Sequence, residues 1–365
     1  MNTSAIAVIL IFGVAFLVMG IEIAHQKRTT GVIDMKAARR WFYRTVGAAL
    51  VLLAGLAIFD LADFGRSRQA LSDAEAGSEA AERHDPDMAI TLYGKAIEAG
   101  TLNDATLGKV YKARGLAHLQ KHDWDAAEQD LAEAAKRGAG DDAIFSFGLG
   151  VAHAGKGEND EALRAFDQAI ASIRDPENLR PSALAARGNI YVTLGQYERG
   201  LKDYDEALSR TPGDTEMRGA RGDAYFYLSQ YDKAEADLAA ASDGDPKMAY
   251  YPLWLYLAQR HQGKDAKAEL EKRAAKLDLQ AWPGPVAEFY RGRIPAADVL
   301  TAARAGDTES QRNHQCEADF YLGEQALLNG DKDEAGRLLG LAAANCDRRF
   351  IEYAGAKAEL GRLAP

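Results

Sequence analysis

The sequence predicts an all-α protein, a solenoid of helical hairpins preceded by one or two N-terminal transmembrane helices. Three observations support this fold class. Gly115, Gly150, Gly188 and Gly222 recur at separations of 35, 38 and 34 residues. Proline is scarce, with 10 among 365 residues, and Ala, Leu, Glu, Lys and Arg dominate after residue 65, as is typical of helices. Two apolar stretches lie ahead of these repeats. A fixed period of this length indicates stacked units that bury their apolar faces against one another.

The N-terminal region predicts a membrane anchor. Ala5–Ile21 is an unbroken apolar run, and no basic residue precedes it, so we expect a span over 5–22 rather than a cleaved signal peptide. A second apolar stretch, Thr45–Phe59, predicts a second span over 45–60. Because that stretch is shorter than the roughly 17 residues of a typical span, the alternative is one span followed by a core or amphipathic helix.

The loop between these stretches sets the predicted orientation. Residues 23–44, between the two expected spans, contain one acidic residue, Asp34, against the basic residues Lys27, Arg28, Lys36, Arg39, Arg40 and Arg44. Basic loops stay on the cytoplasmic side of a membrane. Two spans therefore place the large C-terminal domain in the periplasm, anchored to a bacterial inner membrane, whereas a single span would leave it in the cytoplasm.

A common register runs through the repeats. Its eighth position is glycine, so that the first helix of each hairpin can approach the second closely: Gly77, Gly115, Gly150, Gly188, Gly222 and Gly323. Its twenty-fourth position is a large residue facing that glycine: Tyr93, Leu131, Phe166, Tyr204, Leu238 and Leu339. We therefore divide the chain into an anchor (1–64), about five repeats (65–248), a degenerate repeat with an irregular linker (249–315), and a hairpin with a capping helix (316–365).

These residues resemble the tetratricopeptide-repeat family, whose unit is about 34 residues long. In that family, set positions of the first helix of each hairpin line a concave groove that binds protein partners. The resemblance assigns the groove to Lys112, Leu116, Gln120, Phe147, Val151, Asn189, Asp223, Phe226 and Tyr227. The alternative is that these side chains contact only water or the chain's own terminal segments. Leu116 and Val151 stand where a carboxylate-binding groove would have Asn, which argues against capture of a C-terminal peptide end.

The two cysteines fall at neighbouring points of the last hairpin. Cys316 begins its first helix and Cys346 follows its second, so a disulfide could close the hairpin if the Cα atoms lie within roughly 7 Å. Such a bond requires an oxidising compartment, in agreement with the periplasmic orientation. The alternative is two unpaired thiols in a reducing compartment.

The chain carries no motif of an enzyme. A nucleophile elbow, a zinc-protease motif, a phosphate loop and a dinucleotide fingerprint are all absent from the sequence. His118 and His122 have a metal-ligand spacing, but His118 falls where other repeats have Tyr191 and Tyr225, so we interpret it as a packing residue. We therefore expect no catalytic residues, no metal and no cofactor. The net charge of −10 argues against nucleic-acid binding.

Motifs in the C-terminal third give a narrower resemblance. Leu253–Ala258 (LWLYLA), Trp282, Val286–Gly292 (VAEFYRG) and Asp319–Gly323 (DFYLG) occur in this order. They resemble the NlpI-type periplasmic adaptor family. The resemblance implies a homodimer that docks a tail-specific protease and presents peptidoglycan hydrolases to it, although a membrane hairpin replaces the family's lipid-modified cysteine. The predicted function is thus a periplasm-facing adaptor, with a cytoplasm-facing assembly factor for a membrane complex as the alternative.

Overall fold

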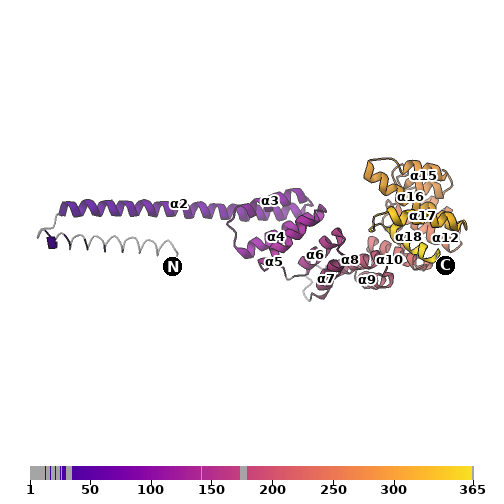
Figure 1. The fold of residues 1–365 in the computed structure, drawn as a ribbon, viewed down its shortest axis with the longest axis horizontal. Coiled ribbons are helices and arrows are strands. Elements are labelled where there is room, and N and C mark those ends of the chain that lie inside the picture. Colours follow the sequence, from indigo (N-terminus) through magenta and orange to yellow (C-terminus); the bar gives the residue numbers. More distant parts are fainter. Residues whose placement is uncertain are drawn as a thin grey trace. The chain divides into compact units, whose positions relative to one another are not determined.

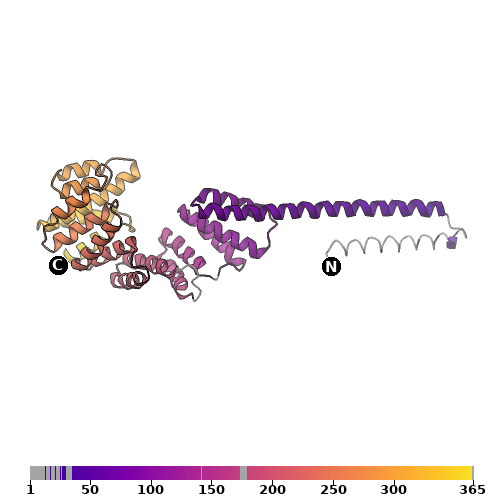
Figure 2. The same ribbon diagram turned by 180° about the vertical axis from the view of Figure 1, so that it is seen from behind.

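The computed structural model describes residues 35–140, 142–172 and 179–363, together with isolated residues between 13 and 29. All regular elements of the described residues are helices (Figure 1; Figure 2 gives the opposite view). The first predicted span (5–22) lies outside the described residues, except for the isolated residues 13, 17 and 21. The chain forms two compact units, 1–121 with 133–138 and 122–132 with 139–365. Helix α5 (Trp124–Lys136) contributes to both.

The first unit is built on one long helix, α2 (Met35–Glu82), which packs against α3 (Pro86–Glu98); α3 in turn packs against α4 (Asp104–Gln120). The predicted second span, 45–60, lies within α2, and the same helix continues as the first helix of the first repeat. The expected boundary at residue 64 therefore falls inside a helix. The physical reason is that residues 60–82 contain neither a proline nor a capping turn to end it.

Asx caps define the helices that follow α2. The Asp85 side chain accepts a hydrogen bond from the Met88 backbone N–H (3.0 Å), with Pro86 at the first helical position. Asn103 caps α4 in the same way, through the Thr106 N–H at 2.9 Å. The two loops are short, so α3 and α4 lie antiparallel to their neighbours, as a solenoid of hairpins requires.

The second unit begins with three regular hairpins: α6 (Ala143–Lys156) with α7 (Asn159–Ala171), α8 (Arg180–Thr193) with α9 (Tyr197–Arg210), and α10 (Thr215–Tyr227) with α11 (Tyr231–Gly244). A degenerate hairpin, α12 (Tyr250–His261) with α13 (Lys267–Ala274), is followed by two short helices, α14 (Gly284–Tyr290) and α15 (Ala296–Ala302). The last hairpin is α16 (Thr308–Leu328) with α17 (Lys332–Asn345), and α18 (Ile351–Leu363) follows it. Helix α16 starts eight residues before Cys316, where we expected its start, because Asp307 caps it.

The predicted glycine-to-knob contact recurs along the array. A Cβ built on Gly188 would lie 2.9 Å from the Tyr204 ring, and one on Gly222 would lie 2.8 Å from Leu238. The knob residues named above, from Tyr93 to Leu339, are all buried. This confirms the packing register, because each hairpin can close only where the first helix has no side chain at this position.

Two arginine clamps link successive hairpins of the second unit. Arg187 of α8 donates from Nε and Nη2 to both oxygens of Asp203 in its own hairpin (2.8 and 2.7 Å). Its Nη1 donates to Asp167 of the preceding hairpin at 2.5 Å. Arg221 repeats this arrangement one hairpin later, with Asp237 and Asp205. The forked guanidinium thus binds a buried carboxylate within one hairpin and an exposed carboxylate from its neighbour.

Candidate partner-binding groove

The predicted groove residues of the first two hairpins in the second unit remain accessible. Phe147 and Val151 of α6 are half-buried, and Asn189 of α8 is exposed. Phe147 contacts Phe166 of α7, with ring centroids 5.9 Å apart. The hydroxyl of Tyr204 donates to Asn189 Oδ1 at 2.5 Å. These three side chains offer a mixed apolar and polar surface, the kind that binds peptides or partner helices.

Lys112, Leu116 and Gln120 lie on α4, in the first unit. Lys112 and Leu116 are half-buried, and Gln120 is exposed. Nearby in the same unit, Asp104, Glu133, Lys136 and Arg137 line a charged recess of about 460 Å³. Glu133 pairs with both Lys136 and Arg137, so the charges of this recess are already largely compensated within the chain.

The remaining predicted groove residues, Asp223, Phe226 and Tyr227 of α10, are not open to a partner in this structure. All three are buried, with exposed fractions of 7%, 0% and 2%. Helix α18 packs against α10, α16 and α17. The Tyr227 hydroxyl donates to the Ile351 carbonyl at the start of α18 (3.0 Å), and Arg362 donates to the Tyr227 carbonyl (2.7 Å). The Phe226 ring packs instead against Tyr231 of α11 and Trp254 of α12. For Asp223 and Tyr227 the chain's own terminal helix occupies the groove, which corrects the expectation of an open surface.

We call the groove residues on which α18 lies the groove floor. This floor extends from α10 to α12 and α16, the first helices of the last two hairpins. Counted in the register of the repeats, their groove positions hold Tyr250, Trp254 and His261 of α12, and Glu317, Phe320, Tyr321 and Glu324 of α16. A Cβ built on Gly355 of α18 would lie 2.8 Å from both Trp254 and Phe320. The two rings stack on each other, with centroids 5.0 Å apart. Helix α18 therefore lies in the groove with its small residues on an aromatic floor.

Buried carboxylates line one end of this floor. Glu317 accepts hydrogen bonds from the Tyr250 hydroxyl and from the indole N–H of Trp282, both at 2.8 Å. Glu352 of α18 accepts from the Tyr321 hydroxyl at 2.7 Å. Burial raises the pKa of Glu352, and the neighbouring charge of Glu317 raises it further. Burial also raises the pKa of Asp223, with a contribution from Glu352. The three acidic groups thus disfavour one another's ionisation.

A compensated polar network lies at the other end. His261 Nε2 and Glu324 Oε2 are 2.8 Å apart, and Arg362 of α18 forks onto both oxygens of Glu359. Burial raises the pKa of Glu324, while the contact with His261 opposes that shift. Arg362 also donates to the Tyr227 carbonyl, which ties this end of α18 to α10.

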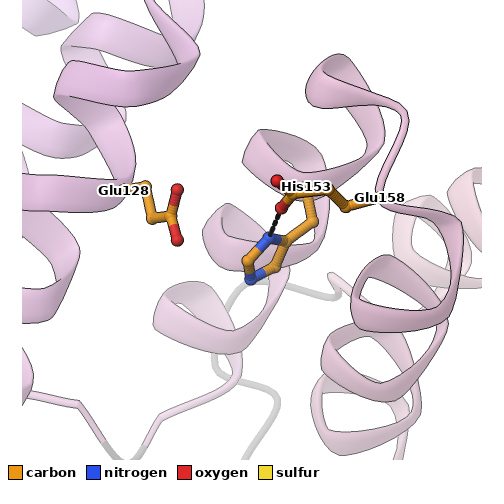
Figure 3. A group of neighbouring side chains, drawn as sticks. All are labelled: Glu128, His153 and Glu158. Atoms are coloured by element: carbon orange, nitrogen blue, oxygen red, sulfur yellow. Dashed lines mark hydrogen bonds and ion pairs between the residues drawn. The ribbon is translucent and has the colours of Figure 1, made fainter.

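Two groups of described residues bring a histidine and two carboxylates close enough to share a cation: Glu128, His153 and Glu158, and His261, Glu324 and Glu359. In the first, His153 Nδ1 lies 2.7 Å from Glu158 Oε2, and Glu128 reaches toward them from α5 (Figure 3). Lys156 Nζ lies 2.6 Å from Glu128 and 3.0 Å from Glu158, so an ammonium already supplies the positive charge. In the second group, the guanidinium of Arg362 supplies the positive charge by pairing with Glu359. In both groups a basic side chain of the protein thus takes the place that a metal ion would need.

The two histidines with metal-ligand spacing belong to different units. His118 is half-buried in α4, in the first unit. His122 lies in the turn that follows, in the second unit, where its ring packs edge-on against Trp124 at 4.9 Å between centroids. His122 has a positive φ of 61°, a conformation suited to a tight turn.

The two cysteines form a disulfide that closes the last hairpin. The Cα atoms of Cys316 and Cys346 are 5.1 Å apart, and both residues are buried. Cys346 immediately follows α17, and the four residues 347–350 separate it from α18. The bond therefore fixes the point from which α18 turns back into the groove.

Sequence reasoning missed Glu317, Glu324, Trp254 and Glu352 as parts of this groove. For the first three a signal was present, because the groove register used for α4, α6, α8 and α10 can be extended over α12 and α16. Acidic and aromatic residues then fall at positions that face the groove. For Glu352 no local signal exists, since only the folded chain brings α18 against α10.

Comparison with known proteins agrees with this architecture. A tetratricopeptide-repeat family model matches residues 112–178 and 185–226. The Pseudomonas aeruginosa protein PilF is 12% identical, with a TM-score of 0.51 over 63% of this chain and 100% of that one. The C-terminal part of a repeat protein from Cytophaga hutchinsonii is 17% identical, with a TM-score of 0.45 over 74% of this chain and 93% of that one. YrrB, described as having an unusual peptide-binding site, is 18% identical, with a TM-score of 0.41 over 53% and 95%.

Identities this low show a shared fold and nothing finer. The family match covers α4 to α10, where the glycine-to-knob register is most regular. Arrays of this kind act as scaffolds for protein–protein interaction. The sequence match and the helical hairpins together show that the chain contains tetratricopeptide repeats.

Proposed function

We propose that this protein is a membrane-anchored adaptor whose repeat array holds protein partners on the periplasmic face of a bacterial inner membrane. The observation that carries the proposal is the presence, in one chain, of an exposed apolar helix and a disulfide. From Val46 onward, α2 has the length and composition of a membrane-crossing helix. Its large side chains are exposed, among them Val51 at 73% and Phe59 at 63%.

Burying such a surface in lipid removes it from water at about 25 cal/mol per Å² of apolar area. The basic loop before α2 favours a cytoplasmic location for that loop, and hence a periplasmic one for the array. The Cys316–Cys346 disulfide supports the same side, because such bonds persist in oxidising compartments. The NlpI-type resemblance extends the proposal to presenting substrates to a tail-specific protease or regulating peptidoglycan hydrolases, with the adaptor acting as a homodimer.

Topology mapping of the full chain tests the proposal. Alkaline phosphatase fused after Pro365 is active only outside the cytoplasm, and a matched fluorescent-protein fusion reports the opposite side. We expect an active phosphatase fusion, together with thiols at Cys316 and Cys346 that resist maleimide until a reductant is added. As a control, exchanging Arg39 and Arg40 for Glu weakens the charge bias of the loop and should mix the orientations. A fluorescent, phosphatase-inactive fusion with free thiols would instead establish the cytoplasm-facing assembly factor.

A further inference from the structure

Helix α18 leaves one carboxylate oxygen of the groove floor without a hydrogen-bond partner. Within the described part of the chain, Glu324 Oε1 is fully buried and accepts no hydrogen bond, although Oε2 contacts His261. Buried polar atoms in native proteins are nearly always paired. The shape of α18 therefore fits the groove better than its hydrogen-bonding chemistry does.

The charge of α18 also fits poorly. Glu352 faces Asp223 and Tyr227 of α10, Tyr250 and Trp254 of α12, and Glu317 and Tyr321 of α16. Among the described residues, no Lys, Arg or His forms an ion pair with Asp223, Glu317 or Glu352. Docking α18 thus buries a third carboxylate beside two others. A basic side chain at the place of Glu352 would instead lie between two carboxylates and compensate both.

The aromatic floor restricts what the groove can hold. Gly355 lies directly over Trp254 and Phe320, and the flanking Ala354 and Ala356 are buried with it. A larger side chain at Gly355 would clash with two rings that are themselves fully packed. An occupant must therefore be a helix with Gly where it crosses these rings. If the groove were empty, both rings would be exposed to water, so α18 can be exchanged for another helix more readily than it can simply leave.

We infer that the groove over α10, α12 and α16 is a binding site for a helix of a protein partner. That helix carries Gly at the place of Gly355, small residues beside it, and a Lys or Arg at the place of Glu352. Helix α18 is the resident occupant that the partner replaces. The Cys316–Cys346 disulfide keeps the last hairpin closed while α18 moves about residues 347–350. This inference rests on the protein-binding role of the array and is independent of its compartment.

Synthetic peptides test the inference on the full chain in detergent micelles. The probe is a fluorescein-labelled peptide of residues 347–363 (DRRFIEYAGAKAELGRL), compared with versions carrying E352K or K357Q. The chain is used in two forms, Gly355→Leu and Gly361→Leu. The first should expel α18 without altering the groove floor. The second is a matched control on the same helix, because a Cβ at Gly361 meets nothing within 4 Å.

We expect the Gly355→Leu chain to bind the native-sequence peptide, and the E352K peptide at least tenfold more tightly, a difference that corresponds to one pKa unit of interaction. The K357Q peptide should bind like the native sequence, because Lys357 is exposed. The Gly361→Leu chain should bind every peptide at least tenfold more weakly, since α18 still fills its groove. Circular dichroism and an intact disulfide verify folding. Gly355→Ala, which places a single methyl on the same rings, replaces Gly355→Leu if that variant unfolds.

Three results would overturn the inference. The folded Gly355→Leu chain could bind no peptide, which would show that the groove is no binding site once α18 has left. The native and E352K peptides could bind equally, which would remove the charge complementarity. Light scattering could show that Gly355→Leu dimerises and that excess peptide does not dissociate the dimer, which would assign the groove to a second copy. None of these results depends on membrane topology, so they are distinguishable from a failure of the adaptor proposal.

Discussion

Removing the guanidinium of Arg187 should destabilise the α8–α9 hairpin far more than removing its exposed partner. In the structure Arg187 binds Asp203, whose side chain is 6% exposed, and Asp167, whose side chain is 57% exposed. The Arg187→Ala change leaves Asp203 buried next to the Tyr204 knob without a counter-charge. The Asp167→Ala change removes only a solvated ion pair and leaves the buried one intact.

The magnitudes follow from this difference in burial. Breaking a buried ion pair by deleting one partner costs about 3–5 kcal/mol. The Arg187 side chain is 20% exposed, so water can partly replace it, and we expect a smaller cost of about 2–3 kcal/mol. An exposed pair is worth at most about 1 kcal/mol. Since 1.4 kcal/mol is a factor of ten in an equilibrium constant, Arg187→Ala should open the hairpin roughly 30- to 150-fold more often.

Hydrogen exchange measures this locally, which matters because a repeat array does not unfold in one step. Amides of α8 and α9 in the full chain should lose protection by that factor in Arg187→Ala, and by less than about fivefold in Asp167→Ala. The second clamp provides an internal replicate, with Asp237 buried and Asp205 exposed. Equal losses for the two variants, or no loss for Arg187→Ala, would refute the view that burial decides the value of these pairs.

Three further predictions concern other parts of the fold. Reducing the Cys316–Cys346 disulfide, which closes a 30-residue separation, should destabilise the last hairpin by about 3–4 kcal/mol on the chain-entropy model, seen as a lower melting temperature with reductant. A Cβ at Gly188 would press on Tyr204, so Gly188→Ala should cost about 1–3 kcal/mol in urea unfolding, whereas Gly336→Ala, with open space in α17, should be neutral or stabilising. Folding raises the pKa of Glu352, so the folded chain binds more protons at this group than the unfolded chain does. The folded chain should therefore lose stability as the pH rises from about 4.3, the pKa of an unperturbed Glu, through the raised pKa. Glu352→Gln should flatten this loss in thermal unfolding followed between pH 5 and 9, and an unchanged pH profile would contradict the assignment.

The repeats could be predicted from sequence because their determinants are local and periodic. The glycine and the large residue that faces it are 16 residues apart in each full copy of the repeat, as Gly188 and Tyr204 are. The same spacing therefore recurs along the chain and can be recognised without a structure. The continuation of α2 could not be predicted in this way. Its composition changes near residue 60 from apolar to charged, which suggests a boundary, yet helix formation depends on backbone hydrogen bonds that this change of composition does not interrupt.

The position of α18 could not be predicted for a different reason. Its sequence identifies it as a helix, and its small residues favour close packing, but neither feature names the surface that it covers. That surface is formed by α10, α12 and α16, which lie up to about 140 residues earlier in the chain. The buried state of Asp223, Phe226 and Tyr227 is therefore a tertiary effect. The register correctly places these residues on the concave side but cannot tell whether that side is open.

The distribution of buried charge indicates what kind of surface α18 covers. A core that has no function besides packing avoids carboxylates, because each one must be paired or neutralised at a cost in stability. Here Asp223, Glu317 and Glu324 are buried, and all three occupy groove positions of the repeat register. In α8 the corresponding position holds Asn189, which is exposed. The buried carboxylates thus have the positions of a polar binding surface, and α18 is one of the elements packed against the helices that carry them. The same chemistry that makes α18 a poor permanent cover makes the groove beneath it suited to a basic helix.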